Sequence, residues 1–212
     1  MKEEEIKRLI DLKKYEENLY KEGIKYICGI DEAGRGPLAG PVVVGAVVMP
    51  RDSMLEFVND SKKVTAKRRE KLYEEIKKEA IAYGIGIIPQ EEIDKVNILN
   101  ATKEGLHTAL GEVIEKLKTK PGIVIVDALR EIDTFGITYE SIIKGDATCY
   151  TISCASILAK VTRDRIMEEW DKIYPEYKFA KHKGYGTKEH IEAIKKYGPC
   201  PIHRKSFITH FI

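Results

Sequence analysis

The 212-residue sequence has few cysteines, and their positions indicate neither a metal site nor a disulfide framework. The four residues, Cys28, Cys149, Cys154 and Cys200, form no CxxC pair and show no zinc-ligand spacing. In a chain of this size they are typical of reduced thiols, so we expect a cytoplasmic protein.

We expect no signal peptide, and the sequence has no long apolar run. The N-terminus, "MKEEEIKRLIDLKKY", is charged throughout and does not resemble a secretory signal. No apolar run is long enough to cross a bilayer. These absences predict a soluble protein that acts away from membranes.

A strong excess of charge of one sign is missing as well. The net charge of +2 is too small to indicate nucleic-acid binding by itself. Residues 160–205, however, contain 12 Lys and Arg against 7 Asp and Glu, and residues 61–79 contain 8 against 4. Two basic stretches offset by acids elsewhere are typical of a nucleic-acid surface beside an acidic site. Solvated helix faces explain the same pattern equally well.

What the sequence does contain is a series of short strands and amphipathic helices, in a chain long enough to bury a core. The expected strands are residues 24–31, 41–49, 81–88, 121–128 and 138–146. The expected helices are residues 3–22, 61–80, 97–117, 154–170 and 187–198. Early strands that pair as hairpins, followed by strands that alternate with helices, predict an α/β fold in which helices cover a mixed sheet.

Acidic residues fall where several of these strands end. Asp31 and Glu32 follow the first strand, Asp127 follows "GIVIV", and Asp146 follows "ESIIKG". Because successive strand residues point to opposite faces, Asp31 and Glu32 can share a site only if the strand stops or bulges there. Carboxylates crowded together need a cation, and their hard oxygens suit Mg²⁺ or Mn²⁺. Two such ions can drive phosphodiester hydrolysis. Taken singly, Asp127 and Asp146 could also be ordinary turn acids.

The segment "GRGPLAG" after the first acids permits two other interpretations. A phosphate-binding loop is disfavoured, because the chain has no GxxxxGK[ST] pattern and a strand, "PVVVGAVV", follows instead of a helix. A plain turn would not need an arginine between two glycines.

Seven motifs in order resemble the type 2 ribonucleases H, the ribonuclease HII family. They are "GIDEAGRGPLAGPVVVGAVV", "DSKK", "IVDA", "IIKGD", "SCASILAKVTRD", "HKGYGTKEH" and "GPCPIHRKSF", and together they span residues 28–207. The resemblance implies a ribonuclease H-like fold with a mixed five-stranded sheet flanked by helices and a helical C-terminal part. It implies endonucleolytic cleavage of RNA in RNA–DNA hybrids and on the 5′ side of ribonucleotides embedded in duplex DNA, leaving 5′-phosphate and 3′-hydroxyl ends.

The resemblance also assigns residues. Its four catalytic, metal-binding acids fall on Asp31, Glu32, Asp127 and Asp146, which agrees with the strand ends. Its Gly-Arg-Gly falls on Gly34, Arg35 and Gly36, and its substrate-sensing tyrosine falls on Tyr185. Glycines allow the backbone to approach a ribose closely, and the 2′-hydroxyl is what distinguishes RNA from DNA. The segment "ALREIDTFGITYES" departs from the family pattern, so Asp133 could be mistaken for a ligand there.

Basic side chains are candidates to hold phosphates, which positions a duplex without reading its sequence. These candidates are Lys62, Lys63, Lys160, Arg163 and Lys183. Asp164 is expected to be a structural ion-pair partner of its arginine neighbours. His182, His190 and His203 lack metal-ligand spacing, although His182 could touch substrate.

The domain organisation expected from the resemblance is an N-terminal helical extension, residues 1–23, and a catalytic domain, residues 24–212. The protein is expected to act as a monomer. A catalytically silent nucleic-acid-binding module on the same fold is the alternative, but such a module gains nothing from carboxylates that face phosphates.

Overall fold

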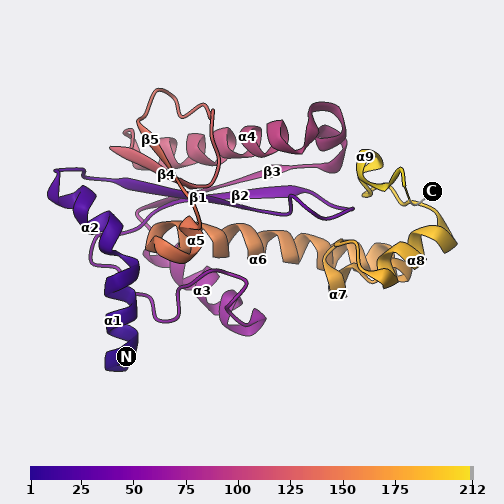
Figure 1. The fold of residues 1–212 in the computed structure, drawn as a ribbon, viewed down its shortest axis with the longest axis horizontal. Coiled ribbons are helices and arrows are strands. Elements are labelled where there is room, and N and C mark those ends of the chain that lie inside the picture. The colour runs from indigo at the N-terminus through magenta and orange to yellow at the C-terminus, as the bar shows by residue number, and fades with distance from the viewer. Residues whose placement is uncertain (211–212) are drawn as a thin grey trace.

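A five-stranded mixed sheet runs through the middle of the computed structural model, which describes residues 1–210 (Figure 1). The strand order is β3-β2-β1-β4-β5. β1 (Ile27–Ala33), β2 (Val42–Val48) and β3 (Ala82–Ile88) are antiparallel neighbours. β4 (Ile123–Asp127) and β5 (Tyr139–Ile142) run parallel to β1. The expected mixed five-stranded sheet is therefore confirmed.

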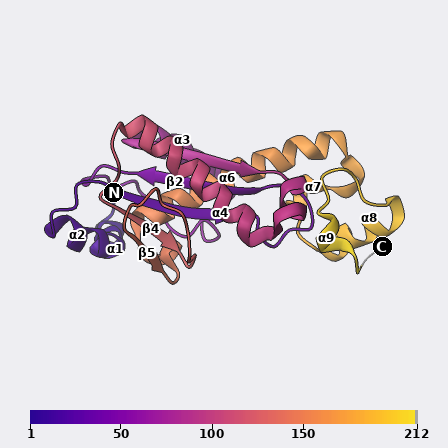
Figure 2. The same ribbon diagram turned by 90° about the horizontal axis from the view of Figure 1, so that it is seen from above.

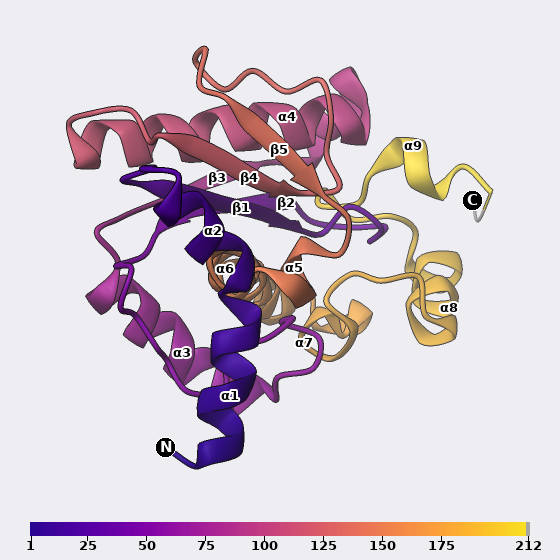
Figure 3. The ribbon, with the colours of Figure 1, turned by 60° about the vertical axis from the view of Figure 1, so that its left-hand side comes forward.

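Helices cover both faces of this sheet (Figure 3). α4 (Gln90–Leu117) packs on β2 and β3, while α6 (Tyr150–Ile173) packs on β1 and β2 from the other side. α3 (Ala66–Glu79) lies outside α6 and packs against it, and Thr65 stands at its N-cap position. α6 comes close to the sheet at Gly45, where a Cβ atom would lie 2.5 Å from the carbonyl oxygen of Ala155.

The long helix α4 is broken at Asn97, which has a φ of 69° and a ψ of 165°. The Asn97 side-chain oxygen accepts hydrogen bonds from the amides of Leu99 and Asn100, at 3.0 and 3.1 Å. This is the arrangement of a helix N-cap. The predicted helix over 97–117 is thus correct, and a preceding segment that begins at Gln90 was not predicted.

The N-terminal segment forms two helices where one was predicted. α1 (Glu3–Leu12) and α2 (Lys14–Lys21) meet at Lys13, whose ammonium group donates to the carbonyl of Ser53 at 2.8 Å. Leu9 and Leu12 are buried in the apolar cluster beneath α3 and α6. The carboxylate of Glu16, which is 1% exposed, accepts from the amide of Thr151 at the start of α6 at 2.7 Å. The two helices therefore support α6 directly.

The C-terminal elements gather beyond the opposite end of the sheet from α1 and α2 (Figure 2). They are α7 (Phe179–His182), α8 (Lys188–Tyr197) and α9 (Lys205–Ile208), with a short 3-10 helix at Pro175–Tyr177. Their apolar cluster includes Leu38 and Ala39 from the connection between β1 and β2. The C-terminal part is thus attached to the loop that carries the glycine-rich motif.

Residues 211–212 of the predicted catalytic domain lie outside the described residues. Among residues 1–210, no helix is sufficiently long and apolar to cross a membrane. All four cysteines are free thiols, and three of them are buried.

Candidate active site

One hollow of about 210 Å³ contains most of the residues that the sequence singles out. Its walls come from the end of β1 and the loop after it, the end of β4, the segment before α3, α5 (Gly145–Thr148), α6 and the turn after α7. The predicted residues that line it are Asp31, Glu32, Gly34, Arg35, Gly36, Lys62, Asp127, Asp146, Lys160 and Tyr185. Segments far apart in the chain therefore meet at one place.

The sheet places Asp31 beside Asp127. β1 and β4 are parallel neighbours, and their last paired residues are Ile30 and Val126. The next residue on each strand is an aspartate. Neighbouring strands lie about 4.8 Å apart and equivalent residues point to the same face, so these two carboxylates adjoin each other on the α6 side of the sheet.

Glu32 reaches the hollow without the expected strand stop or bulge. β1 continues through Ala33, and Glu32 pairs with Val44 of β2 in regular register. β4, however, ends at Asp127, so β1 extends past its neighbour on that side. The prediction that the strand breaks at Glu32 was wrong, because the sheet edge itself opens the hollow to this side chain.

Asp146 does not follow a strand directly, contrary to the prediction. β5 ends at Ile142, Lys144 adopts a left-handed conformation with φ 59°, and Asp146 lies in the short helix α5. The amide of Gly145 donates to Asp127 Oδ1 at 2.7 Å. This bond holds the start of α5 against the end of β4, which brings Asp146 to the acidic cluster.

The carboxylates of Asp31, Glu32 and Asp127 are only partly compensated by the protein. Burial raises the pKa of Asp31 well above its ordinary value, and repulsion from Glu32 and Asp127 adds to this effect. Burial also raises the pKa of Glu32 and of Asp127. Two cations form long ion pairs with the cluster: Lys62 Nζ is 3.7 Å from Asp146 Oδ2, and Arg35 Nη1 is 3.5 Å from Glu32 Oε1.

A divalent cation fits this cluster by charge and by donor type, since carboxylate oxygens are the ligands that Mg²⁺ and Mn²⁺ prefer. As the side chains stand, no group of three His, Cys, Asp or Glu within residues 1–210 is arranged to hold one ion. To share an ion, Asp146 would have to turn from Lys62, and Glu32 from Arg35.

The glycine-rich loop is held by two buried arginines. Arg204 donates to the carbonyls of Gly34, Arg35 and Gly40 at 2.6, 3.0 and 2.9 Å. Arg163 donates to the carbonyls of Ala39, Pro41 and Lys183 at 3.0, 2.9 and 2.9 Å. Because these carbonyls point into the protein, the loop is fixed from its inner side.

The loop tolerates little change at Gly34, which has a φ of 102° and where a Cβ atom would collide with the Arg163 side chain. Arg163 and Arg204 are 1% and 0% exposed. Burial lowers their pKa to about 10 and about 9, respectively. The prediction that Arg163 binds phosphate was wrong, because its guanidinium is turned inward and its donors are used by backbone carbonyls.

Tyr185 lies at the edge of the hollow with 44% of its surface exposed. A Cβ atom on Gly36 would be 3.9 Å from the Tyr185 ring, so the ring lies beside the glycine-rich loop. The Arg163 guanidinium lies 5.9 Å from the ring centroid. An exposed ring between glycine-rich segments is available to pack on a sugar or base.

The predicted lysines occupy different environments. Lys62 and Lys160 line the hollow, and Lys160 donates to Asp164 at 2.6 Å. Lys63 lies outside it, in a small neighbouring cavity with Arg8. Lys183 pairs with Glu168 at 2.6 Å.

Two acids outside the hollow are accounted for by local contacts. Asp164 is an ion-pair partner as predicted, although its partners are Lys160 and Arg69 rather than its arginine neighbours in sequence. Asp133 lies away from the hollow, where its carboxylate accepts from the amide of Phe135 at 2.9 Å.

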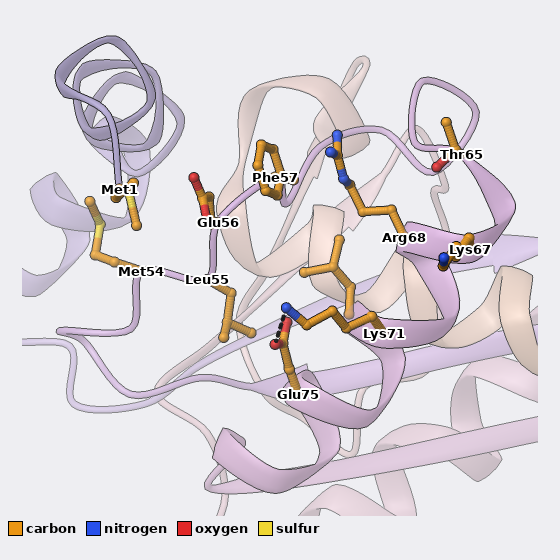
Figure 4. Close-up of a pocket in the computed structure, with 11 residues that line it drawn as sticks. Met1, Met54, Leu55, Glu56, Phe57, Thr65, Lys67, Arg68, Lys71 and Glu75 are labelled. Carbon is orange, nitrogen blue, oxygen red and sulfur yellow. Dashed lines mark ion pairs between the residues drawn. The ribbon is translucent and has the colours of Figure 1, made fainter.

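A second cavity, of about 590 Å³, lies between the N-terminus, the segment around Phe57 and α3 (Figure 4). Apolar side chains such as Met54 and Leu55 line it together with Lys67, Arg68 and Lys71. It contains none of the four acids, so it is not the candidate active site despite its greater size.

Sequence reasoning missed Arg204, whose carbonyl partners lie more than 160 residues earlier in the chain. It also missed Ser61 and Ser156, which line the hollow and hydrogen-bond to each other at 2.9 Å. The only signal for Arg204 was its place in the last motif, "GPCPIHRKSF".

Comparison with known proteins identifies the family of the chain. The family model described as Ribonuclease HII matches residues 28–210. Ribonuclease HII of Caldanaerobacter subterraneus subsp. tengcongensis is 55% identical over 206 residues, which cover 97% of this chain and 83% of that protein.

Solved structures show the same fold. The crystal structure of ribonuclease H2 from Pyrococcus horikoshii superposes with a TM-score of 0.71 at 30% identity, over 86% of this chain and 93% of that one. RNase HII of Archaeoglobus fulgidus, solved in a complex with PCNA, gives a TM-score of 0.73 at 28% identity, over 87% and 96% of the two chains. The chain therefore belongs to the ribonuclease HII family and is a metal-dependent endoribonuclease of the ribonuclease H class.

Proposed function

We propose that the protein cleaves the RNA strand of RNA–DNA hybrids and cuts on the 5′ side of ribonucleotides embedded in duplex DNA, leaving 5′-phosphate and 3′-hydroxyl ends. The observation that carries the proposal is the single hollow in which four carboxylates face the glycine-rich loop and Tyr185. A catalytically silent binding module would have no use for a cluster of buried carboxylates beside phosphates.

Asp31, Glu32, Asp127 and Asp146 are proposed to hold two Mg²⁺ or Mn²⁺ ions. When bound, such ions activate a water molecule and stabilise the departing oxygen of a phosphodiester. The raised pKa of Asp31, Glu32 and Asp127 supports this assignment, because burial and mutual repulsion leave a cluster that a cation would relieve.

Gly34, Arg35 and Gly36 are proposed to read the ribose through their backbone. Arg204 draws two of the loop's carbonyls inward, which leaves the outer side of the loop free to approach a sugar closely. Such a reader is indifferent to base identity. Tyr185 would then contact the neighbouring sugar, where a deoxyribose allows closer packing than a ribose.

Lys62, Lys63 and Lys160 are proposed to bind substrate phosphates. Lys62 is the most exposed cation beside the acidic cluster, with 80% of its side chain accessible. Phosphate contacts of this kind position a duplex without conferring sequence preference.

The proposal extends to the organisation of the chain. Residues 24–212 would form the catalytic domain, and residues 1–23 would be a helical extension that supports α6 through Glu16. We propose that the protein acts as a monomer in the cytoplasm, where its free thiols would remain reduced.

The test is a nuclease assay on a labelled RNA–DNA hybrid and on a duplex with one ribonucleotide, with Mg²⁺, with Mn²⁺ and with chelator. Cleavage on the 5′ side of the ribonucleotide, only when a divalent ion is present, is expected. Tight binding of hybrid without cleavage under all conditions would instead favour the binding module.

A further inference from the structure

Three buried histidines lie beneath the turn that presents Tyr185. His182, His190 and His203 are 8%, 0% and 3% exposed. The His190 ring stacks on His182 with centroids 4.5 Å apart, and it meets His203 edge to edge through their Nε2 atoms at 3.0 Å. None of them lines the hollow, so they touch neither the carboxylates nor the proposed substrate position.

Tyr185 needs external anchors, because it stands between two glycines. Gly184 has a φ of 82°, and neither flanking residue has a side chain to fix the turn. The carbonyl oxygen of Tyr185 accepts two hydrogen bonds, from the amide of Thr187 at 2.8 Å and from His190 Nδ1 at 2.9 Å. Distant segments hold the residues before Tyr185: the amide of Leu38 donates to the Gly184 carbonyl at 2.8 Å, and Arg163 donates to the Lys183 carbonyl at 2.9 Å. The bond from His190 is the one that ties the Tyr185 carbonyl itself to a side chain of α8.

The hydrogen bonds determine which nitrogen of each ring carries the proton. His203 Nδ1 lies 2.9 Å from the amide of Cys200, a donor, and 3.2 Å from the carbonyl of Cys200, an acceptor. We assign Nδ1 as the acceptor of the shorter bond, which places the proton of a neutral His203 on Nε2. His203 Nε2 then donates to His190 Nε2, which leaves the His190 proton on Nδ1, facing the Tyr185 carbonyl. Burial lowers the pKa of His190 to about 4 and also lowers the pKa of His203, so both rings are neutral at neutral pH.

The other end of this chain of bonds reaches the glycine-rich loop. His203 forms an isolated β-bridge with Ala39, and the next residue, Arg204, binds the carbonyls of Gly34 and Arg35. One C-terminal turn therefore contacts both the loop proposed to read the ribose and, through His190, the turn that carries Tyr185.

We propose that His190 and His203 form a positioning pair that sets Tyr185 against the Gly34–Gly36 loop and thereby controls discrimination between ribose and deoxyribose at the cleavage junction. This inference rests on the proposed function, because it assumes that Tyr185 contacts the sugar next to the cleaved bond. The pair acts through Tyr185 and not on the substrate.

The first test needs no variant and no substrate. In protein labelled with ¹⁵N at histidine, long-range proton–nitrogen NMR spectra distinguish the two neutral tautomers. We expect the proton of His190 on Nδ1 and that of His203 on Nε2 at pH 7. A His190 protonated on Nε2 would overturn the proposal, because its Nδ1 could not then donate to Tyr185.

The second test compares two substitutions of one residue. Asn places its amide near the position of Nδ1 and can still donate to the Tyr185 carbonyl, whereas Gln places its amide near Nε2 and cannot. The readout is kcat/KM on a single-ribonucleotide duplex divided by kcat/KM on a long hybrid. His190→Gln should lower this ratio by about three- to tenfold, the effect of one lost hydrogen bond, and His190→Asn should lower it by less than about twofold. His107→Gln, at an exposed histidine on α4, is the control and should leave the ratio unchanged.

The outcomes separate the inference from the proposed function. Equal losses on both substrates in His190→Gln and His190→Asn would show a purely structural role and overturn the positioning pair. If Tyr185→Ala lowers the ratio and His190→Gln does not, the pair is overturned while the proposed function stands. If Tyr185→Ala itself leaves the ratio unchanged, the proposed role of Tyr185 fails and the positioning pair fails with it.

Discussion

Two buried groups of titratable side chains meet at Tyr185, and their hydrogen bonding differs sharply. In the acidic hollow, Asp31, Glu32 and Asp127 repel one another, and the nearest cations stand 3.5–3.7 Å from carboxylate oxygens. In the histidine pair, every ring nitrogen of His190 and His203 has a partner within the protein. The negative charge of the hollow is not fully compensated, so the hollow is suited to bind a cation. The hydrogen bonds of the histidine pair are all satisfied within the protein, so the pair is suited to hold the Tyr185 turn in one conformation.

The comparison predicts the largest effects in the hollow. Asp127→Asn should lower cleavage more than about a hundredfold, because it removes one of the carboxylates proposed to hold the ions. Mg²⁺ at a hundred times its Kd should stabilise the wild type by about 2.7 kcal/mol, and most of this gain should disappear in the variant. Calorimetry with and without Mg²⁺, beside the cleavage assay, measures both effects.

Asp133→Asn is the matched control for this prediction, since Asp133 lies outside the hollow and an Asn oxygen can still accept from Phe135. It should leave both cleavage and the Mg²⁺ effect unchanged. Full activity in Asp127→Asn would remove Asp127 from the site.

Two alanine substitutions in the glycine-rich loop should behave differently. Gly34→Ala should lower the free energy of unfolding by about 1–3 kcal/mol, because φ is 102° and the new Cβ atom meets Arg163. Gly36→Ala has no such contact, so its Tm should stay near that of the wild type while cleavage falls if substrate approaches Gly36 closely. Thermal unfolding and kcat/KM on the same preparations measure this. A similar loss of Tm in both variants would contradict the structural distinction.

A smaller effect concerns stability without metal. Asp31→Asn should raise the Tm in chelator at pH 7, because it removes a buried carboxylate whose pKa is raised by burial and by repulsion. The same variant should lose cleavage. A lower Tm in chelator would mean that the ionised cluster is already well compensated.

The pH dependence of stability should have opposite signs in the two regions. The pKa of His190 is lowered from 6.5 to about 4, so the unfolded chain takes up more protons in this range. The contribution of the pair is therefore complete above pH 6.5 and is lost as the pH falls toward 4. The carboxylates, whose pKa is raised in the fold, oppose this loss because they take up protons first in the native state.

The measurement is Tm from pH 7 to pH 4.5 in chelator. Asp31→Asn should show the steeper decline on acidification, since it removes part of the opposing carboxylate effect. Parallel curves for the variant and the wild type would contradict this assignment of the two signs.

Local patterns in the sequence predicted much of the fold and part of the candidate site. Apolar β-branched runs followed by acids located β1 and β4, and parallel pairing then placed Asp31 beside Asp127. The sequence predicted Asp146 as a site residue because it was expected to follow a strand. In the structure its position depends instead on the hydrogen bond from the Gly145 amide to Asp127. At the break between α1 and α2, Lys13 donates to the carbonyl of Ser53, a partner that no local pattern indicates.

Residues that act through distant backbone groups could not be predicted. Arg163 and Lys62 are both cations in basic stretches, yet Arg163 is buried among carbonyls and Lys62 is exposed beside carboxylates. The partners of Arg163 lie 20 to 124 residues away, and those of Arg204 lie up to 170 residues away. Charge alone does not distinguish a cation that is free to bind phosphate from one whose donors bind backbone carbonyls inside the protein.

Cleavage of three labelled duplexes by the wild type and by Tyr185→Ala tests the central claim most directly: one ribonucleotide in DNA, a long RNA–DNA hybrid, and pure DNA. The wild type should cut the first two and leave the third intact. Tyr185→Ala should lose about ten- to a hundredfold on the single-ribonucleotide duplex, while the Tm increase caused by Mg²⁺ stays unchanged. A wild-type enzyme that cuts the long hybrid and ignores the single ribonucleotide would contradict the account, and Tyr185 would then have only a structural role.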